Sequence, residues 1–72
     1  MKEVGGGKMK FIIIESVNGD VTGYVTAPYY AVSKDKAKAK VFEYGLDASL
    51  TAYALRKQNH KDYLVKMIGG EA

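Results

Sequence analysis

The chain has 72 residues, with 11 Lys and Arg against 8 Asp and Glu, one His and no Cys. A domain of this size buries only roughly 60% of the surface that its unfolded chain exposes, so its core is thin. Disulfides are excluded and one His cannot build a zinc site, so packing or a partner must supply the stability. The net charge of +3 is small and a single Arg is present, which favours nucleic-acid binding only slightly.

The N-terminal stretch MKEVGGGK predicts a flexible arm, because the three glycines at 5–7 leave the backbone free. The apolar run at residues 11–14 is too short for a signal peptide, and no stretch approaches the roughly 20 apolar residues that span a bilayer. The lack of Cys is typical of a reducing compartment. We therefore predict a soluble cytoplasmic protein without membrane association, with an arm at residues 1–8, one domain at 9–68 and a flexible tail at 69–72.

The stretch KFIIIESVNGDVTGYVTA at residues 10–27 predicts a β-hairpin. Its Asn18-Gly19 pair is the preferred two-residue turn, since both residues tolerate positive φ between β-forming flanks. Uninterrupted pairing from this turn places Ile12 opposite Val25 and Ile14 opposite Gly23. The predicted core face then carries Ile12, Ile14, Ser16, Val21, Gly23, Val25 and Ala27. The small residues on that face leave room for a helix, and the opposite face is half apolar.

Pro28 cannot donate a backbone hydrogen bond, so it ends the second strand or bends it. We favour a bulge at Pro28, with residues 29–32 continuing as an edge segment.

The next stretch, SKDKAKAKVFEYG at residues 33–45, sets lysines at every second position and allows a strand or a helix. Ser33 is a good N-cap, Gly45 a good stop, and apolar residues at 37, 41 and 44 form one helical stripe. We therefore predict a helix in which Val41 is buried while Lys36 and Lys38 are solvated.

A second helix is predicted for DASLTAYALRKQNH, capped by Asp47 and ending at Asn59 or His60. Its apolar stripes are Ala48, Ala52 and Leu55, and further round Leu50 and Ala54. Residues 63–68 follow as a third strand, stopped by two glycines. The predicted fold is α+β: a small antiparallel sheet, built from the hairpin and the C-terminal strand, with one or two helices packed on one face in the order ββααβ.

No catalytic constellation is found along the chain. His60 lies alone in a polar stretch, and the glycines at 5–7 precede the first strand and lack the Lys-Ser/Thr of a phosphate-binding loop. The carboxylates fall at expected turns, caps and exposed faces: Glu15, Asp20, Asp35, Glu43, Asp47 and Asp62. We therefore expect a non-enzymatic protein with no catalytic residue, metal site or cofactor.

The six tyrosines and the lysines are the candidates for partner contact. Tyr is favoured where one end of a side chain is buried and the other is wet, as at interfaces, although it also caps the edge of a thin core. Three alternatives stay open. One is a protein-binding module, the second is a nucleic-acid-binding protein that uses the lysine-rich helix, and the third is a subunit that oligomerises through the exposed sheet face.

The hairpin followed by YYAVSKDKAKAKVFEYG resembles small early proteins encoded by phages, over residues 10–68. Some of those proteins bind bacterial RNA polymerase and inhibit transcription initiation. The resemblance implies a viral regulator of transcription in the host cytoplasm, with RNA polymerase as its partner and the N-terminal arm as a contact segment. It carries over no functional residue. The side chains we expect at a partner interface are Lys2, Glu3, Val4, Tyr24, Tyr29, Tyr30, Lys34 and Lys38.

Overall fold

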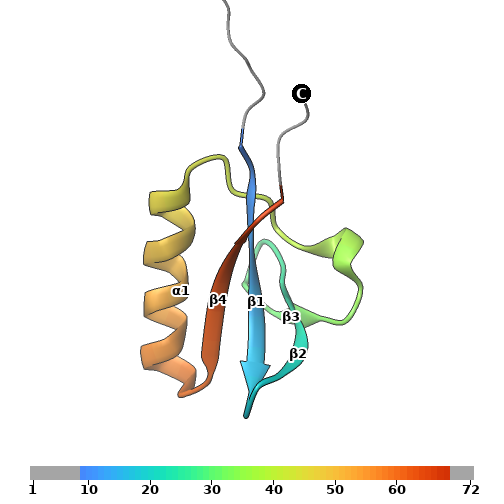
Figure 1. The fold of residues 1–72 in the computed structure, drawn as a ribbon, viewed down its shortest axis with the longest axis vertical. Helices are drawn as coiled ribbons and strands as arrows, with labels where there is room; N and C mark the ends of the chain where they lie inside the picture. The colour runs from blue at the N-terminus through green and yellow to red at the C-terminus, as the bar shows by residue number, and fades with distance from the viewer. Residues whose placement is uncertain (1–8, 69–72) are drawn as a thin grey trace, which may run out of the picture.

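The computed structural model describes residues 9–68 and contains a four-stranded antiparallel sheet with one α-helix on one face (Figure 1). The elements are β1 (Phe11–Val17), β2 (Asp20–Val25), β3 (Val32–Ser33), the short 3₁₀ helix η1 (Lys36–Lys38), α1 (Gly45–Asn59) and β4 (Asp62–Met67). The strand order across the sheet is β3-β2-β1-β4. The predicted α+β class is confirmed, but one α-helix forms and the order ββααβ is not observed. The arm at 1–8 and the tail at 69–72 lie outside the described residues.

The two-residue hairpin turn is confirmed, with φ of 54° at Asn18 and 87° at Gly19. Val17 pairs with Asp20 as predicted, but the register shifts between residues 15 and 16 of β1. Beyond that point Glu15 pairs with Gly23 and β2 contains one extra residue, Thr22, so a β-bulge interrupts the ladder. The predicted pairing of Ile14 with Gly23 and of Ile12 with Val25 is therefore wrong.

The bulge exchanges the faces of β1 relative to β2, because a shift of one residue turns every side chain to the other side. Ile13, and not Ile12 or Ile14, packs in the main core with Val25. Ile12 is also buried but lies on the opposite face of β1. The core cluster consists of Ile13, Val25, Phe42, Ala48, Ala52, Leu55 and Tyr63, with Phe11 packed against it.

After β2 the chain turns back on itself and does not continue through a bulge at Pro28. The Ala27–Pro28 peptide bond is cis, and β3 returns antiparallel to pair with the end of β2. The predicted edge segment thus exists as Val32–Ser33, but the bulge at Pro28 is wrong. Gly23 makes room for this edge strand, since a Cβ on Gly23 would lie 2.8 Å from the carbonyl oxygen of Ser33.

The predicted helix at 33–45 is wrong, because the segment is mostly extended and crosses from β3 to α1 at one end of the sheet (Figure 1). Its backbone completes hydrogen bonds that the sheet leaves open: Lys40 N–H donates to the carbonyl of Val25 at 2.8 Å, and Phe11 and Phe42 exchange bonds of 2.9 and 2.8 Å. Phe42 is 6% exposed whereas Val41 is 45% exposed, which reverses the predicted burial. Strand pairing and burial of Phe42 outweigh the helical pattern.

Only the 3₁₀ turn η1 remains of that predicted helix. Asp35 caps it by accepting a hydrogen bond of 2.9 Å from the backbone of Ala37, while the Ser33 hydroxyl accepts from the backbone of Asp35. Lys36 and Lys38 are solvated, as predicted.

Helix α1 begins at Gly45, two positions before the predicted cap and at the residue expected to stop the preceding helix. The predicted stripe of Ala48, Ala52 and Leu55 is buried, but Leu50 and Ala54 are exposed. The helix ends at Asn59 as predicted, with His60 in the left-handed region. Strand β4 starts and ends one residue before the predicted strand.

Candidate protein-binding groove

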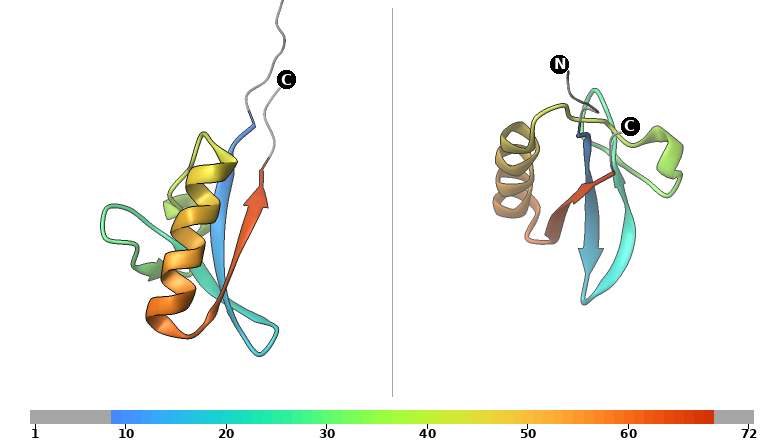
Figure 2. Two further views of the ribbon diagram at one scale, coloured as in Figure 1. Left: turned by 90° about the vertical axis from the view of Figure 1, so that its left-hand side faces the viewer. Right: turned by 45° about the horizontal axis from the view of Figure 1, so that its top comes forward.

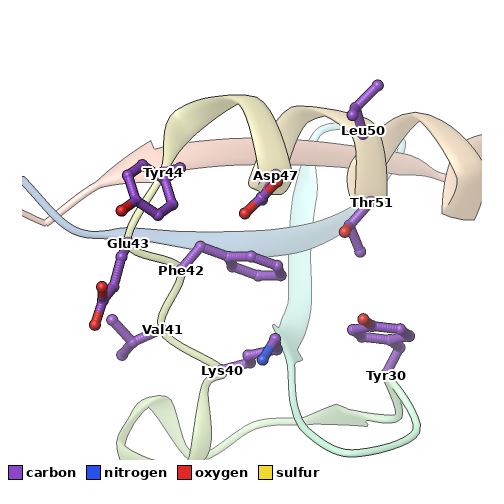
Figure 3. Close-up of a pocket in the computed structure, with 9 residues that line it drawn as sticks. All are labelled: Tyr30, Lys40, Val41, Phe42, Glu43, Tyr44, Asp47, Leu50 and Thr51. Carbon is purple, nitrogen blue, oxygen red and sulfur yellow. The ribbon is translucent and has the colours of Figure 1, made fainter.

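A hollow lies at the end of the sheet where the extended segment enters α1 (Figure 3). Its volume is about 480 Å³, within the range of protein ligand pockets. We call it the α1 groove. It is lined by Tyr30, Lys40, Val41, Phe42, Glu43, Tyr44, Asp47, Leu50 and Thr51.

The sheet positions the floor of the α1 groove. The backbone bonds between Phe42 and Phe11 fix the extended segment, and the Phe42 ring packs into the core below. The ammonium of Lys40 lies 5.1 Å from the centre of that ring, a cation–π contact. Successive side chains of an extended segment point to opposite sides, so Val41 points outward while Phe42 points into the core.

Exposed apolar side chains border the floor. Tyr44 is 66% exposed and Leu50 is 58% exposed, although both line the groove. Leu46, Leu50 and Tyr53 follow each other at i, i+4 and i+7 along α1, and all are exposed, so the apolar surface continues from the groove along the helix.

Tyr30 enters the groove from the turn after β2 (Figure 3). Its φ of 60° lies in the left-handed region, which costs a bulky L-residue about 1–2 kcal/mol. Strained backbone of this kind is concentrated at functional sites. The neighbouring Tyr29 is 88% exposed and does not line the groove.

The rim of the groove carries two carboxylates and one ammonium. Glu43 and Asp47 are exposed, while Lys40 is half-buried against Phe42. Asp47 lies in the first turn of α1, where a negative charge complements the helix dipole. The groove therefore combines apolar walls with a slightly acidic rim.

The residues that the sequence singled out for partner contact do not form one site. Tyr30 lies in the α1 groove, whereas Tyr24 and Lys34 share a second hollow of about 270 Å³ with Val21, Thr22 and Gly23. Tyr29 is in a turn, and Lys38 is on η1. Lys2, Glu3 and Val4 lie outside the described residues.

The eight side chains expected at a partner interface do not include Val41, Tyr44 and Leu50, which line the groove. Val41 and Tyr44 were assigned to the buried stripe of a helix that does not form, and Leu50 to a second covered stripe of α1. The available signal was the three-residue stripe of Leu46, Leu50 and Tyr53, which runs opposite to the stripe of alanines that packs on the sheet.

A cluster of polar side chains lies at the other end of α1, next to Asn59. Glu15, predicted to be an exposed carboxylate, is only 6% exposed. It accepts hydrogen bonds from the hydroxyls of Thr22 at 2.6 Å and Tyr63 at 2.7 Å, and Tyr63 accepts one from Asn59 at 3.0 Å. The ammonium of Lys61 lies 3.8 Å from the same carboxylate. We call these five residues the Glu15 cluster.

The Glu15 cluster shifts the pKa of two of its members. Burial by itself raises the pKa of Glu15, but the hydrogen bonds from Thr22 and Tyr63 and the charge of Lys61 outweigh burial, so the pKa is lowered overall. Burial and the bond to Glu15 raise the pKa of Tyr63. The cluster thus keeps the carboxylate charged and the phenol neutral.

Comparison with models of protein families, with curated proteins and with solved structures gave no match. Among residues 9–68, no group of three or more His, Asp or Glu side chains could hold a metal ion. None of the helices in the described part of the chain is long and apolar enough to cross a membrane.

Proposed function

We propose that this chain is a small non-enzymatic protein-binding module that binds its partner through the α1 groove. The observation that carries the proposal is the gathering of exposed Val41, Tyr44 and Leu50 around one hollow whose floor is Phe42. Single exposed apolar side chains are normal, but apolar patches at a concave site are typical of protein interaction surfaces.

The chemistry of the groove defines the partner segment. Tyr and Leu beside a well-packed floor provide anchors that exclude water from a central contact. Glu43 and Asp47 on the rim favour a basic residue next to the inserted side chain. The partner is therefore a protein segment that presents a large apolar side chain beside Lys or Arg.

The identity of the partner is proposed from the resemblance to small phage early proteins. We infer a viral regulator that binds bacterial RNA polymerase in the host cytoplasm and inhibits transcription. What supports this step is the resemblance, while the groove supports the broader statement that the chain binds a protein.

Nucleic acid is the alternative partner, and its basis is weaker in the folded chain. The lysine-rich helix on which it rested does not form, and Lys34 and Lys40 lie in different hollows. The remaining lysines of the segment point into solvent on a 3₁₀ turn, which is typical of a solvated surface.

The test is direct binding to purified bacterial RNA polymerase, with matched tyrosine variants. Tyr44→Ser and Leu50→Ser should each weaken binding at least about tenfold, because each removes an anchor worth about 1.4 kcal/mol or more. Tyr29→Ser, which removes an exposed ring outside the groove, should bind as the wild type does. Inhibition of transcription in vitro should follow the same order.

Two results would contradict the proposal, each in a different part. If the wild type does not bind polymerase, the partner is wrong. If it binds and the groove variants bind equally well, the groove is not the contact surface.

A further inference from the structure

Strand β4 is one edge of the four-stranded sheet. Within residues 9–68 it pairs with β1 on one side and with no strand on the other. The left panel of Figure 2 shows β4 at the margin of the sheet, beside α1 and not beneath it. The opposite edge, β3, has only two residues, so β4 with six is the edge that can extend the sheet.

The hydrogen-bond pattern shows which backbone groups of β4 point outward. Ile68 N–H donates to the carbonyl of Lys10, and the register with β1 continues without a shift to Asp62. Hydrogen-bonded pairs alternate along an antiparallel ladder, so the even residues of β4 bond to β1. The N–H and C=O groups of Tyr63, Val65 and Met67 therefore face away from the sheet.

The side chains of β4 are self-complementary about Leu64. In an antiparallel pair of two β4 strands centred on Leu64, Asp62 of one copy faces Lys66 of the other, and the reverse. The same register places Tyr63 opposite Val65, so the outward backbone groups meet as hydrogen-bonded pairs. Leu64 meets its own copy between the two charge pairs, and it is exposed in the single chain.

Other symmetric registers lose this match. Centring the pair on Lys66 or on Asp62 sets like charges opposite each other, and centring it on Val65 sets Lys66 opposite Leu64. A lone Lys on an edge strand discourages pairing, but here Asp62 neutralises it in one register only. The charges thus select that register.

We propose that two copies of this chain pair through β4, centred on Leu64, to form a two-fold symmetric dimer with a continuous eight-stranded sheet. Such an interface is isologous and closes after two copies. Both α1 helices lie on the same face of the eight-stranded sheet, because odd-numbered residues of β4 in one copy pair with odd-numbered residues of β4 in the other. A six-residue edge buries less than the roughly 1,200 Å² of a standard interface, so we expect a dissociation constant on the order of 100 µM.

A charge-swap series on the full chain tests the register. Asp62→Lys or Lys66→Asp alone places like charges at both symmetric pairs and should weaken dimerisation roughly tenfold, measured by sedimentation velocity over a range of concentrations. The double variant Asp62→Lys/Lys66→Asp restores opposite charges and should dimerise as the wild type does. Both side chains are exposed, so circular dichroism should show each variant folded.

A second measurement follows the edge itself. Val65→Pro removes an outward N–H, which an edge strand tolerates, and should give a folded monomer. In the wild type, amide exchange at Tyr63 and Val65 should slow as the concentration rises, while Leu64 and Lys66 stay protected at all concentrations by β1.

Three outcomes would overturn the dimer. The first is a protein that stays monomeric up to about 1 mM, ten times the expected dissociation constant. The second is a double variant that dimerises as weakly as the single variants. The third is an assembly of more than two copies. Since β4 contributes no residue to the α1 groove, the charge variants should still bind the partner. Failure of the dimer and failure of the groove proposal are therefore distinguishable.

Discussion

The two ends of α1 support opposite kinds of surface. At its last residue, Asn59 joins the Glu15 cluster, in which a carboxylate is buried and takes two hydrogen bonds from side chains and a charge contact from Lys61. In its first two turns, Asp47 and Leu50 line the α1 groove, where large apolar side chains face solvent. A carboxylate is therefore buried next to the C-terminal end of α1, whereas apolar side chains are exposed at its N-terminal end.

The difference indicates which end is complete within the single chain. A buried carboxylate is tolerated only when partners satisfy it, and the Glu15 cluster supplies them from Thr22 of β2, Tyr63 of β4 and Lys61 between α1 and β4. Apolar surface that stays exposed to water does not stabilise the folded chain, and covering it with a partner lowers the free energy of the complex. The Glu15 cluster should therefore control stability, and the apolar side chains of the α1 groove should control binding.

Phe42 belongs to both the core and the groove floor, and its loss should have the largest effect. Phe42→Ala should cost about 3–4 kcal/mol of unfolding free energy, because it empties a buried aromatic site in a thin core. The matched change Val41→Ala removes an exposed side chain and should cost less than about 0.5 kcal/mol. Chemical denaturation of both variants checks this. Equal losses would mean that the segment is not extended as described.

Glu15→Ala should rank second. It leaves the buried hydroxyl of Tyr63 without its acceptor, and a buried unsatisfied group costs about 1–3 kcal/mol. The half-buried hydroxyl of Thr22 loses the carboxylate but still donates to the backbone carbonyl of residue 15. Asp20→Ala, at an exposed carboxylate of the same hairpin, serves as the control and should change stability little. If the two variants unfold at the same denaturant concentration, the Glu15 cluster does not stabilise this end of α1.

The Glu15 cluster also predicts pH dependence on both sides of neutrality. The pKa of Glu15 is lowered in the folded state, so its stabilisation is present above the unfolded pKa near 4.5 and is lost as pH falls through the folded pKa. The pKa of Tyr63 is raised, so its stabilisation is present below the unfolded pKa near 10.0 and is lost as pH rises through the folded pKa. Thermal unfolding from acid to alkaline pH measures both limbs. Glu15→Gln should flatten the acid limb, and an unchanged limb would contradict its assignment to Glu15.

Groove variants should have the smallest effect on stability. Tyr44→Ser and Leu50→Ser change exposed side chains and should alter the unfolding free energy by less than about 0.5 kcal/mol while they weaken partner binding. A large loss of stability would show that these side chains complete the core. The N-terminal end of α1 would then not be a binding surface distinct from the stabilising Glu15 cluster at the other end.

The lysines of the segment between β3 and α1 sharpen the contrast between protein and nucleic acid as partners. We expect no discrete complex with short DNA or RNA in a mobility-shift assay at low salt. A complex that weakens steeply with salt, and that is abolished by charge reversal at Lys34 and Lys38, would favour nucleic acid, because each neutralised phosphate releases counterions.

Local signals determined the elements that depend on neighbours in sequence. The Asn18-Gly19 turn, the buried stripe of Ala48, Ala52 and Leu55, and a strand close to β4 all follow from turn chemistry and periodicity. The candidate site was predictable only in part, since among the expected contact residues that lie within residues 9–68, Tyr30 alone lines the groove.

Only the tertiary structure decided which face of β1 is buried and what the lysine-rich segment becomes. The bulge at Thr22 exchanges the faces, and the carboxylate that bonds to Thr22 also bonds to Tyr63, 48 residues away along the chain. The segment leading to Phe42 is extended because Phe11 and Val25 present unpaired backbone groups there. The position of the α1 groove follows from the same pairing, which buries Phe42 and turns its neighbours outward, so it depends on contacts that no local pattern in the sequence contains.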